Sequence, residues 1–276
     1  MSTYAPAGAT RPGRPRVIPR AASAAAPRDE ILHAAAELFV NRGFAATSTR
    51  DIAEKVGIRQ ASLYYHFVGK PGILAELLEL SVRPSLDMVE RIELECPADA
   101  PEAALYLLAL IDADTLATVP HNIGRLYRMP DVRRSEVFGE FEPALRELTA
   151  AYGRLGADVV SSPVAASVNM DQLGGLLVQA VEVVIRIRSR GDEVAPGQAR
   201  AIAATCLRIC GVPEERIARA TVMADDLLLR PAACADWVSD PADRSLSALL
   251  PDEAEGVPGG VGVDPPTPRG LEQPST

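Results

Sequence analysis

Residues 48–70 read STRDIAEKVGIRQASLYYHFVGK, and this stretch decides the fold of the N-terminal part of the chain. Thr49 can cap a short helix over Arg50–Val56, and Gly57 then ends it because glycine adopts the left-handed backbone at little steric cost. A second short helix is expected over about residues 60–67. Two short helices joined by a tight turn containing glycine form a helix-turn-helix, whose second helix can enter a major groove.

The side chains of the second helix suit a DNA surface. Its start carries the polar residues Arg59, Gln60 and Ser62, and its flanks carry residues able to hold phosphates, namely Tyr64, Tyr65, His66 and Lys70. Arginine can bind guanine bidentately, glutamine can bind adenine, and alanine can touch a thymine methyl group. The stretch is therefore interpreted as a DNA-binding module.

The same residues resemble the N-terminal DNA-binding domain of TetR-family transcriptional regulators. The shared features are the preceding helix ILHAAAELFVNRGFAATS, then T-x-x-D-I-A, V-G-I and S-L-Y-Y-H-F, and a lysine three residues after the phenylalanine. The resemblance covers roughly residues 28–80. The family usually has Ser or Thr where Arg59 stands and Gly where Ala61 stands. The second helix therefore lacks the common cap, and the operator sequence is hard to infer.

The resemblance implies a role for each matching position. Phosphate contacts are implied at Thr49, Tyr64, His66 and Lys70, and contacts to bases or their sugars at Arg59, Gln60, Ala61, Ser62 and Tyr65. A helix is expected to start near Pro71, so a phosphate at Lys70 would also meet a helix N-terminus. One of the two tyrosines is expected to lean inward and the other outward. For His66 a partly buried, hydrogen-bonded role is an open alternative.

The whole chain is predicted to be all-α, with an N-terminal three-helix helix-turn-helix domain followed by a larger helical ligand-binding and dimerisation domain. The predicted divisions are a disordered basic arm (1–27), the helix-turn-helix domain (28–82), the helical domain (83–250) and a disordered tail (251–276). The arm either contacts DNA or is a solvated leader.

Prolines punctuate the predicted helices. Helix 1 is expected from residue 27 or 28 to Asn41, and a linking helix over Ile73–Val82 is expected to be interrupted or ended by Pro84. The later predictions are Ser85–Glu95, Pro101–Thr118, Asn122–Tyr127, Val132–Leu155, Val168–Arg190, Pro196–Cys210 and Glu214–Leu229.

The helices over Val168–Arg190 and Pro196–Cys210 are predicted to form a dimer interface. Gly174 and Gly175 would allow close approach beside a wide apolar face, and the alternative is an internal core helix. A dimer would match palindromic half-sites by its two-fold symmetry. The predicted interface residues are Leu173, Leu176, Leu177, Ala180, Val181, Val184 and Ile185.

The resemblance also implies a ligand cavity within about residues 85–190, although no motif locates it. An aliphatic-rich domain suggests an apolar or amphipathic small molecule. The polar and aromatic candidates are Tyr106, His121, Asn122, Arg125, Tyr127, Arg128, Phe138, Phe141, Tyr152, Asn169, Gln172 and Gln179.

Charge is divided unevenly along the chain. Residues 1–83 carry 11 Lys and Arg against 7 Asp and Glu, a net charge of +4, whereas the other 193 residues carry 17 against 30, a net charge of −13. The basic excess lies with the helix-turn-helix, and the acidic remainder should discourage nonspecific DNA binding. No apolar run of about 18 residues and no secretion signal are recognisable, so a cytoplasmic protein is expected.

The positions of the cysteines and histidines indicate packing roles rather than redox or metal-binding roles. Cys206 and Cys210 are four residues apart on a predicted helix, and core packing is expected for them, with redox sensing as the alternative. The histidines are His33, His66 and His121, and no ligand cluster is recognisable, so no metal site or cofactor is predicted. His33 is interpreted as a surface residue.

The leading hypothesis is a homodimeric repressor that a small molecule releases from a palindromic DNA operator. The second hypothesis is a DNA-binding regulator that is controlled by a protein partner and has no ligand cavity. The sequence does not distinguish it from the leading hypothesis. An enzyme with a vestigial helix-turn-helix is the third hypothesis. Against an enzyme stand the absence of a phosphate-binding glycine loop, a Gly-x-Ser-x-Gly turn and a metal-ligand spacing in the sequence.

Overall fold

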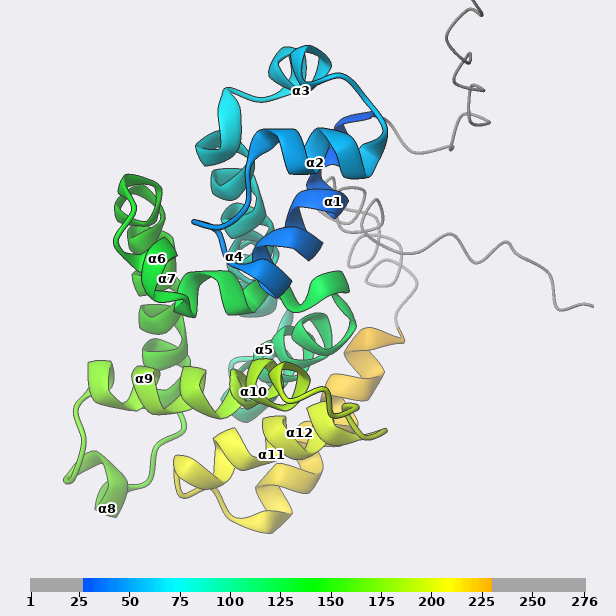
Figure 1. Ribbon diagram of the computed structural model, residues 1–276. Coiled ribbons are helices and arrows are strands. Elements are labelled where there is room, and N and C mark those ends of the chain that lie inside the picture. Colours follow the sequence, from blue (N-terminus) through cyan, green and yellow to red (C-terminus); the bar gives the residue numbers. More distant parts are fainter. Residues whose placement is uncertain (1–26, 230–276) are drawn as a thin grey trace, which may run out of the picture.

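The computed structural model describes residues 27–229, and within that range every regular element is a helix. The N-terminal domain consists of α1 (Pro27–Arg42), α2 (Thr49–Val56) and α3 (Gln60–His66), followed by the long helix α4 (Gly69–Glu95). Figure 1 shows the first three helices at one end of the molecule, with α4 leading from them into the larger helical body. The predicted all-α fold class is confirmed. Residues 1–26 of the predicted arm, residues 230–250 of the predicted helical domain and the predicted tail lie outside the described residues.

The start of α2 corrects one prediction, because its cap is Ser48 and not Thr49. The Ser48 side chain accepts a hydrogen bond from the backbone N–H of Asp51, and the Asp51 carboxylate accepts from the backbone N–H of Ser48. This reciprocal pair satisfies two N–H groups that a helix start otherwise leaves open. Gly57 ends α2 as predicted, with a φ of 82°.

Helix α4 corrects a second prediction, because it continues through Pro84. The proline lacks the N–H that would bond to the carbonyl of Leu80, but the helix continues past it to Glu95. Burial of Leu77, Leu78 and Leu86 on both sides of the proline outweighs the missing bond. The predicted domain boundary at residue 82 therefore falls inside one helix.

The body is built around α5, whose side chains are buried on nearly all sides. Helices α4, α7, α11 and α12 pack against it, and α7 also packs against α9. The elements of the body are α5 (Pro101–Thr118), η1 (Pro120–Arg128), α6 (Pro130–Arg133), α7 (Glu136–Ala157), α8 (Ser162–Ala165), α9 (Met170–Val181), α10 (Val183–Ser189), α11 (Gln198–Ile209) and α12 (Glu214–Leu228).

Two predicted long helices are interrupted in the structure. The segment predicted over 132–155 is divided by Ser135, which caps α7 by accepting from the N–H of Phe138. The segment predicted over 168–190 is broken at Glu182. The buried carboxylate of Glu182 accepts hydrogen bonds from the Tyr127 hydroxyl (2.9 Å) and from Arg128 (3.3 Å), so tertiary contacts accompany this break.

The predicted dimer face belongs mainly to the core of one protomer. Gly174 of α9 lies against α7, and a Cβ built there would be 2.3 Å from the carbonyl oxygen of Thr149. This approach turns the apolar face of α9 inward. Of the predicted interface residues, Leu173, Leu177 and Val181 of α9 and Val184 and Ile185 of α10 are at most 2% exposed, so these five side chains are buried within one protomer.

The cysteine prediction is confirmed for the described residues. Cys206 and Cys210 are free and fully buried. Burial raises the pKa of Cys206 to about 12 and that of Cys210 to about 11, which disfavours the reactive thiolate form. Both side chains pack as small apolar groups.

Among the described residues, no single helix is long and apolar enough to cross a membrane. Helices α5 and η1 meet the length and composition test only when taken together, across a bend of 111°.

Candidate DNA-binding interface

Helix α3 rests on the core through Leu63 and presents its other side chains outward. Leu63 is fully buried, whereas Tyr64 and Tyr65 are 54% and 88% exposed. The expectation that one tyrosine leans inward is therefore wrong, because Leu63 and Phe67 already fill the core side of the helix. The predicted base-contacting residues Arg59, Gln60, Ala61 and Ser62 are all exposed.

Thr49 joins the two helices of the motif through its side chain. Its hydroxyl oxygen accepts a hydrogen bond of 2.8 Å from the Gln60 amide and lies 3.2 Å from the Tyr64 hydroxyl. These contacts restrict the rotamers of Gln60 and Tyr64 before any DNA is bound. A side chain held in place in advance loses less entropy on binding.

The start of α3 agrees with the missing cap predicted from the sequence. Arg59 occupies the N-cap position with an extended backbone, and its side chain makes no capping hydrogen bond. The side chain is exposed beside Gln60, where a guanidinium can approach a base edge or a phosphate.

Lys70 is less free than the sequence suggested. It lies in the first turn of α4, and its ammonium donates a hydrogen bond of 2.6 Å to the carbonyl oxygen of Phe44. The ammonium also lies 4.3 Å from the centre of the Phe44 ring. Burial lowers the pKa of Lys70, while nearby Asp131 opposes that shift. Lys70 thus fixes the loop after α1, and two of its three N–H donors remain for a phosphate.

His66, the last residue of α3, and Val68, which follows the helix, complete this surface. His66 is half-buried and its ring packs edge-on against Tyr65, with the ring centres 5.4 Å apart. Val68 is 93% exposed between α3 and α4. It was missed from the sequence because a single apolar residue outside a helix carries no periodic signal. Its side chain is suited to touch a sugar or a thymine methyl group.

The motif is attached to the body by contacts from η1 and α6. Arg125 of η1 donates to the carbonyl oxygen of Val40 at 3.3 Å, and the Asp131 carboxylate accepts from the backbone N–H of Ala45 at 2.8 Å. Arg125, predicted to line a ligand cavity, is therefore an exposed residue that contacts α1.

Most of the other predicted ligand residues are occupied in the protein itself. Tyr106 and Phe141 are buried in the core, and Tyr127 bonds to Glu182. Asn169 and Gln172 are exposed and form the capping box of α9. The structure does not bring these residues together around one cavity, because the capping pair lies outside the core that holds the aromatic rings.

A buried polar group that the sequence did not single out links three helices. The Asp112 carboxylate of α5 accepts hydrogen bonds from Ser85 of α4 (2.9 Å) and from Tyr152 of α7 (2.8 Å). Burial raises its pKa to about 6, against the two hydrogen bonds that lower it. The available signal was an aspartate within a mostly apolar helix, where Asp112 and Asp114 interrupt a run of apolar residues.

Two hollows in the described part of the body open to the surface. One, of about 530 Å³, lies between α5 and the turn before α11, where Asp114, Arg188 and Glu193 contribute to its wall. The other, of about 230 Å³, lies between the start of α5 and α12, beside Glu102 and Arg216. Neither is lined by a predicted ligand residue.

Comparison with known proteins agrees with the geometry of the motif. Residues 31–77 match the family described as "Bacterial regulatory proteins, tetR family". The crystal structure of Mycobacterium smegmatis AmtR is 36% identical to this chain and aligns with a TM-score of 0.63, over 79% of this chain and 100% of that one. The chain belongs to the TetR family.

The curated sequence relatives match a shorter part of the chain than the solved structures do. The HTH-type transcriptional repressor KstR2 of Mycolicibacterium smegmatis is 49% identical over 51 residues, which are 18% of this chain and 25% of that protein. The chain thus spans about a quarter of the length of the first curated relatives that it matches. The structure titled "SmeT-Triclosan complex" is 19% identical, covers 67% of this chain and 89% of that one with a TM-score of 0.51, and shows the shared fold alone.

Proposed function

We propose that this protein is a sequence-specific DNA-binding transcriptional regulator, acting as a homodimeric repressor on a palindromic operator. The observation that carries the proposal is the exposed polar face of α3, from Arg59 to Tyr65, held in place by the single buried residue Leu63. A regulator rather than an enzyme is supported by membership of a family of bacterial regulatory proteins.

The contacts suggest a division of labour on the interface. Gln60, aligned by Thr49, and Arg59 would read base edges in the major groove. Tyr64, Lys70 and His66 would hold phosphates and so fix the register of the helix on the duplex. Thr49 would act through Gln60 and Tyr64, with the phosphate contact implied by the family resemblance as a further role.

A homodimer would place two α3 helices on two half-sites. When the buried residues of α9 and α10 are set aside, Leu176 and Ala180 remain as interface candidates from the predicted set. They lie one helical turn apart, and Leu176 is 49% exposed. Two-fold symmetry of such a dimer would match the symmetry of a palindrome.

Control by a small molecule would require two arrangements of the two α3 helices with different affinities for the ligand. The continuous helix α4 and the contacts of Arg125 and Asp131 give a path by which a change in the body would move the motif. Fatty acids of graded chain length are suitable amphipathic probes, and release of bound DNA by one of them would support this mechanism.

Control by a protein partner is the second candidate. It is favoured by the engagement of Tyr127, Asn169 and Gln172 within the protein and by the surface position of both hollows. A stable complex of the DNA-bound protein with a cellular protein, with no response to amphipathic probes, would favour it over a small-molecule effector.

Selection of bound duplexes from a random DNA pool tests the proposed function. The full chain should enrich a palindrome whose half-sites are about one helical turn apart or a multiple of it. A folded protein that enriches no sequence would contradict sequence-specific binding.

A further inference from the structure

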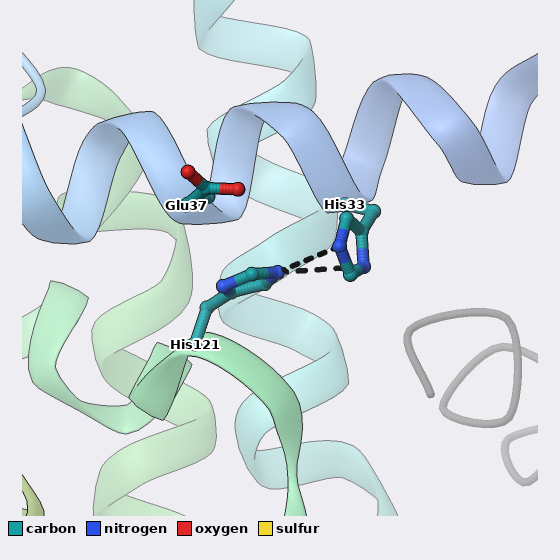
Figure 2. A group of neighbouring side chains, drawn as sticks. All are labelled: His33, Glu37 and His121. Carbon is teal, nitrogen blue, oxygen red and sulfur yellow. Dashed lines mark hydrogen bonds between the residues drawn. The ribbon is translucent and has the colours of Figure 1, made fainter. Parts of the chain in front are cut away.

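Three side chains that are far apart in the sequence meet where α1 touches η1. His33 and Glu37 lie one turn apart on α1, and His121 comes from η1, 88 residues after His33. Figure 2 shows the His121 ring reaching from below toward both side chains on α1. All three residues are half-buried, and one nitrogen or oxygen atom from each lies within 4.8 Å of the others. The interpretation of His33 as a plain surface residue is therefore wrong, because its ring packs on that of His121.

The spacing of the two imidazoles suits a shared ion. Nε2 of His121 lies 3.0 Å from Nε2 and 3.4 Å from Nδ1 of His33. Nitrogen ligands bind Zn²⁺ at about 2.0–2.1 Å, so two of them in a tetrahedral site are roughly 3.3 Å apart. The rings are thus close to the separation that an ion requires, and small rotations would point both lone pairs at it.

The backbone that carries His121 is held in an uncommon conformation. His121 and Asn122 have φ values of 56° and 52°, which few residues other than glycine adopt. The Asn122 amide donates to the carbonyl oxygen of Ile185 (3.1 Å) and to the Ser189 hydroxyl (3.2 Å), which anchors this turn to α10. The surrounding structure therefore fixes the direction of His121 toward α1.

The donor set has the chemistry of a transition-metal site. Two imidazoles and one carboxylate are ligands of Zn²⁺ and similar ions, whereas Mg²⁺ and Ca²⁺ prefer oxygen ligands alone. Lys55 donates to Oε1 of Glu37 at 2.8 Å, and the second carboxylate oxygen can serve the ion.

We propose that His33, Glu37 and His121 bind one divalent transition-metal ion, with Zn²⁺ as the expected class, across the junction of α1 and η1. The ion replaces the hydrogen bond between the two imidazoles, and solvent completes its coordination. Since α1 belongs to the DNA-binding domain and η1 to the body, the ion clamps the two parts together. Metal binding at this site does not depend on the proposed DNA-binding function, so each can be tested without the other.

Cobalt provides a direct readout, because Co²⁺ bound at such a site gives visible absorption bands. The full chain, stripped with a chelator, should bind one Co²⁺ per protomer without a sulfur-to-metal band, and Zn²⁺ should displace it. Zn²⁺, but not Mg²⁺, should also raise the thermal unfolding temperature, because an ion that binds only the folded state stabilises it. Absence of saturable binding, or a band showing cysteine ligation, would overturn the proposal.

Variants assign the ligands. His33→Gln, Glu37→Gln and His121→Asn should each weaken Zn²⁺ binding at least about 100-fold, since loss of a supporting residue alone costs about 10- to 100-fold. Asparagine is chosen at position 121 because it tolerates a positive φ. His66→Gln removes the third histidine of the chain and should leave Zn²⁺ affinity unchanged. The ligand variants are first shown, without metal, to unfold at the wild-type temperature. If they then keep the wild-type Zn²⁺ affinity, or if His66→Gln loses as much affinity as they do, the binding is adventitious only.

Discussion

At the scale of single residues, Thr49 shows how α2 prepares α3 for DNA. The sequence predicted both helices from local signals, namely a capping residue before the first helix and Gly57 in the turn between them. It could not predict that Thr49 would bond to Gln60 and Tyr64, because that contact depends on the angle between the helices. The cap at Ser48 was mistaken for Thr49 because both residue types cap helices well.

Gln60→Ala tests base reading by α3. Loss of the amide should cost about 1–3 kcal/mol on the selected operator and relax preference at one base pair in each half-site. Selection with the variant, followed by titration on operators that differ at that base pair, provides the measurement. Gln198→Ala, in α11 of the body, is the matched control and should leave the preference unchanged. An equal loss on all sequences would make Gln60 a residue that only positions the helix.

Lys70→Ala tests two roles of one ammonium group. Loss of its charge-assisted bond to Phe44 should lower the free energy of unfolding by roughly 1–3 kcal/mol. Loss of a phosphate contact should weaken binding to all sequences and reduce the magnitude of the salt slope by about 1. Chemical denaturation and salt-dependent titrations separate the two effects. A destabilised variant with an unchanged slope would show that Lys70 only holds the loop.

At the scale of elements, the apolar face of α9 was found from the sequence, but its partner was not. Periodicity identifies a buried face and does not say whether the same chain or a second copy covers it. Gly174 decides the matter in the structure, because its lack of a side chain lets α9 approach α7. The continuity of α4 through Pro84 was missed for a related reason, since burial on both sides of the proline is a tertiary effect.

Neighbouring glycines in α9 give a matched pair of variants. Gly174→Ala should destabilise the protein by about 1–3 kcal/mol, since its Cβ would collide with the backbone of α7. Gly175→Ala meets nothing within 4 Å and should stabilise it by about 0.5–1 kcal/mol through helix propensity. Thermal or chemical denaturation measures both. Equal effects of the two variants would contradict the close packing of α7 on α9.

Asp112, between α4, α5 and α7, should make stability depend on pH. Burial raises the pKa of Asp112 to about 6, above the ordinary aspartate pKa of about 3.9. Between these two pH values the folded state therefore binds more protons than the unfolded state. The contribution of Asp112 to stability should therefore fall as pH rises from about 4 to 6, and then remain constant. Asp112→Asn, measured by denaturation across this range, should remove that decline relative to the wild type. An identical pH profile would refute the raised pKa.

At the scale of the whole molecule, the basic excess lies in the N-terminal part, which holds the helix-turn-helix, and the acidic excess lies in the remainder. The sequence located the DNA-binding domain because its motif is local and contiguous. It could not locate the cluster of His33, Glu37 and His121, whose members meet only through the packing of η1 on α1. The predicted ligand residues are likewise not gathered around one cavity in the described part of the structure, since residue type alone does not say which side chains a fold brings together.

The most direct measurement of the central claim is the affinity of the full chain for its selected palindrome and for a scrambled duplex of equal length, at several salt concentrations. Sequence-specific recognition by α3 predicts binding to the palindrome at least about 1,000-fold tighter at physiological salt. It also predicts two protomers on each duplex. Equal affinities with the same salt slope would mean that the protein holds only phosphates, and would contradict the account.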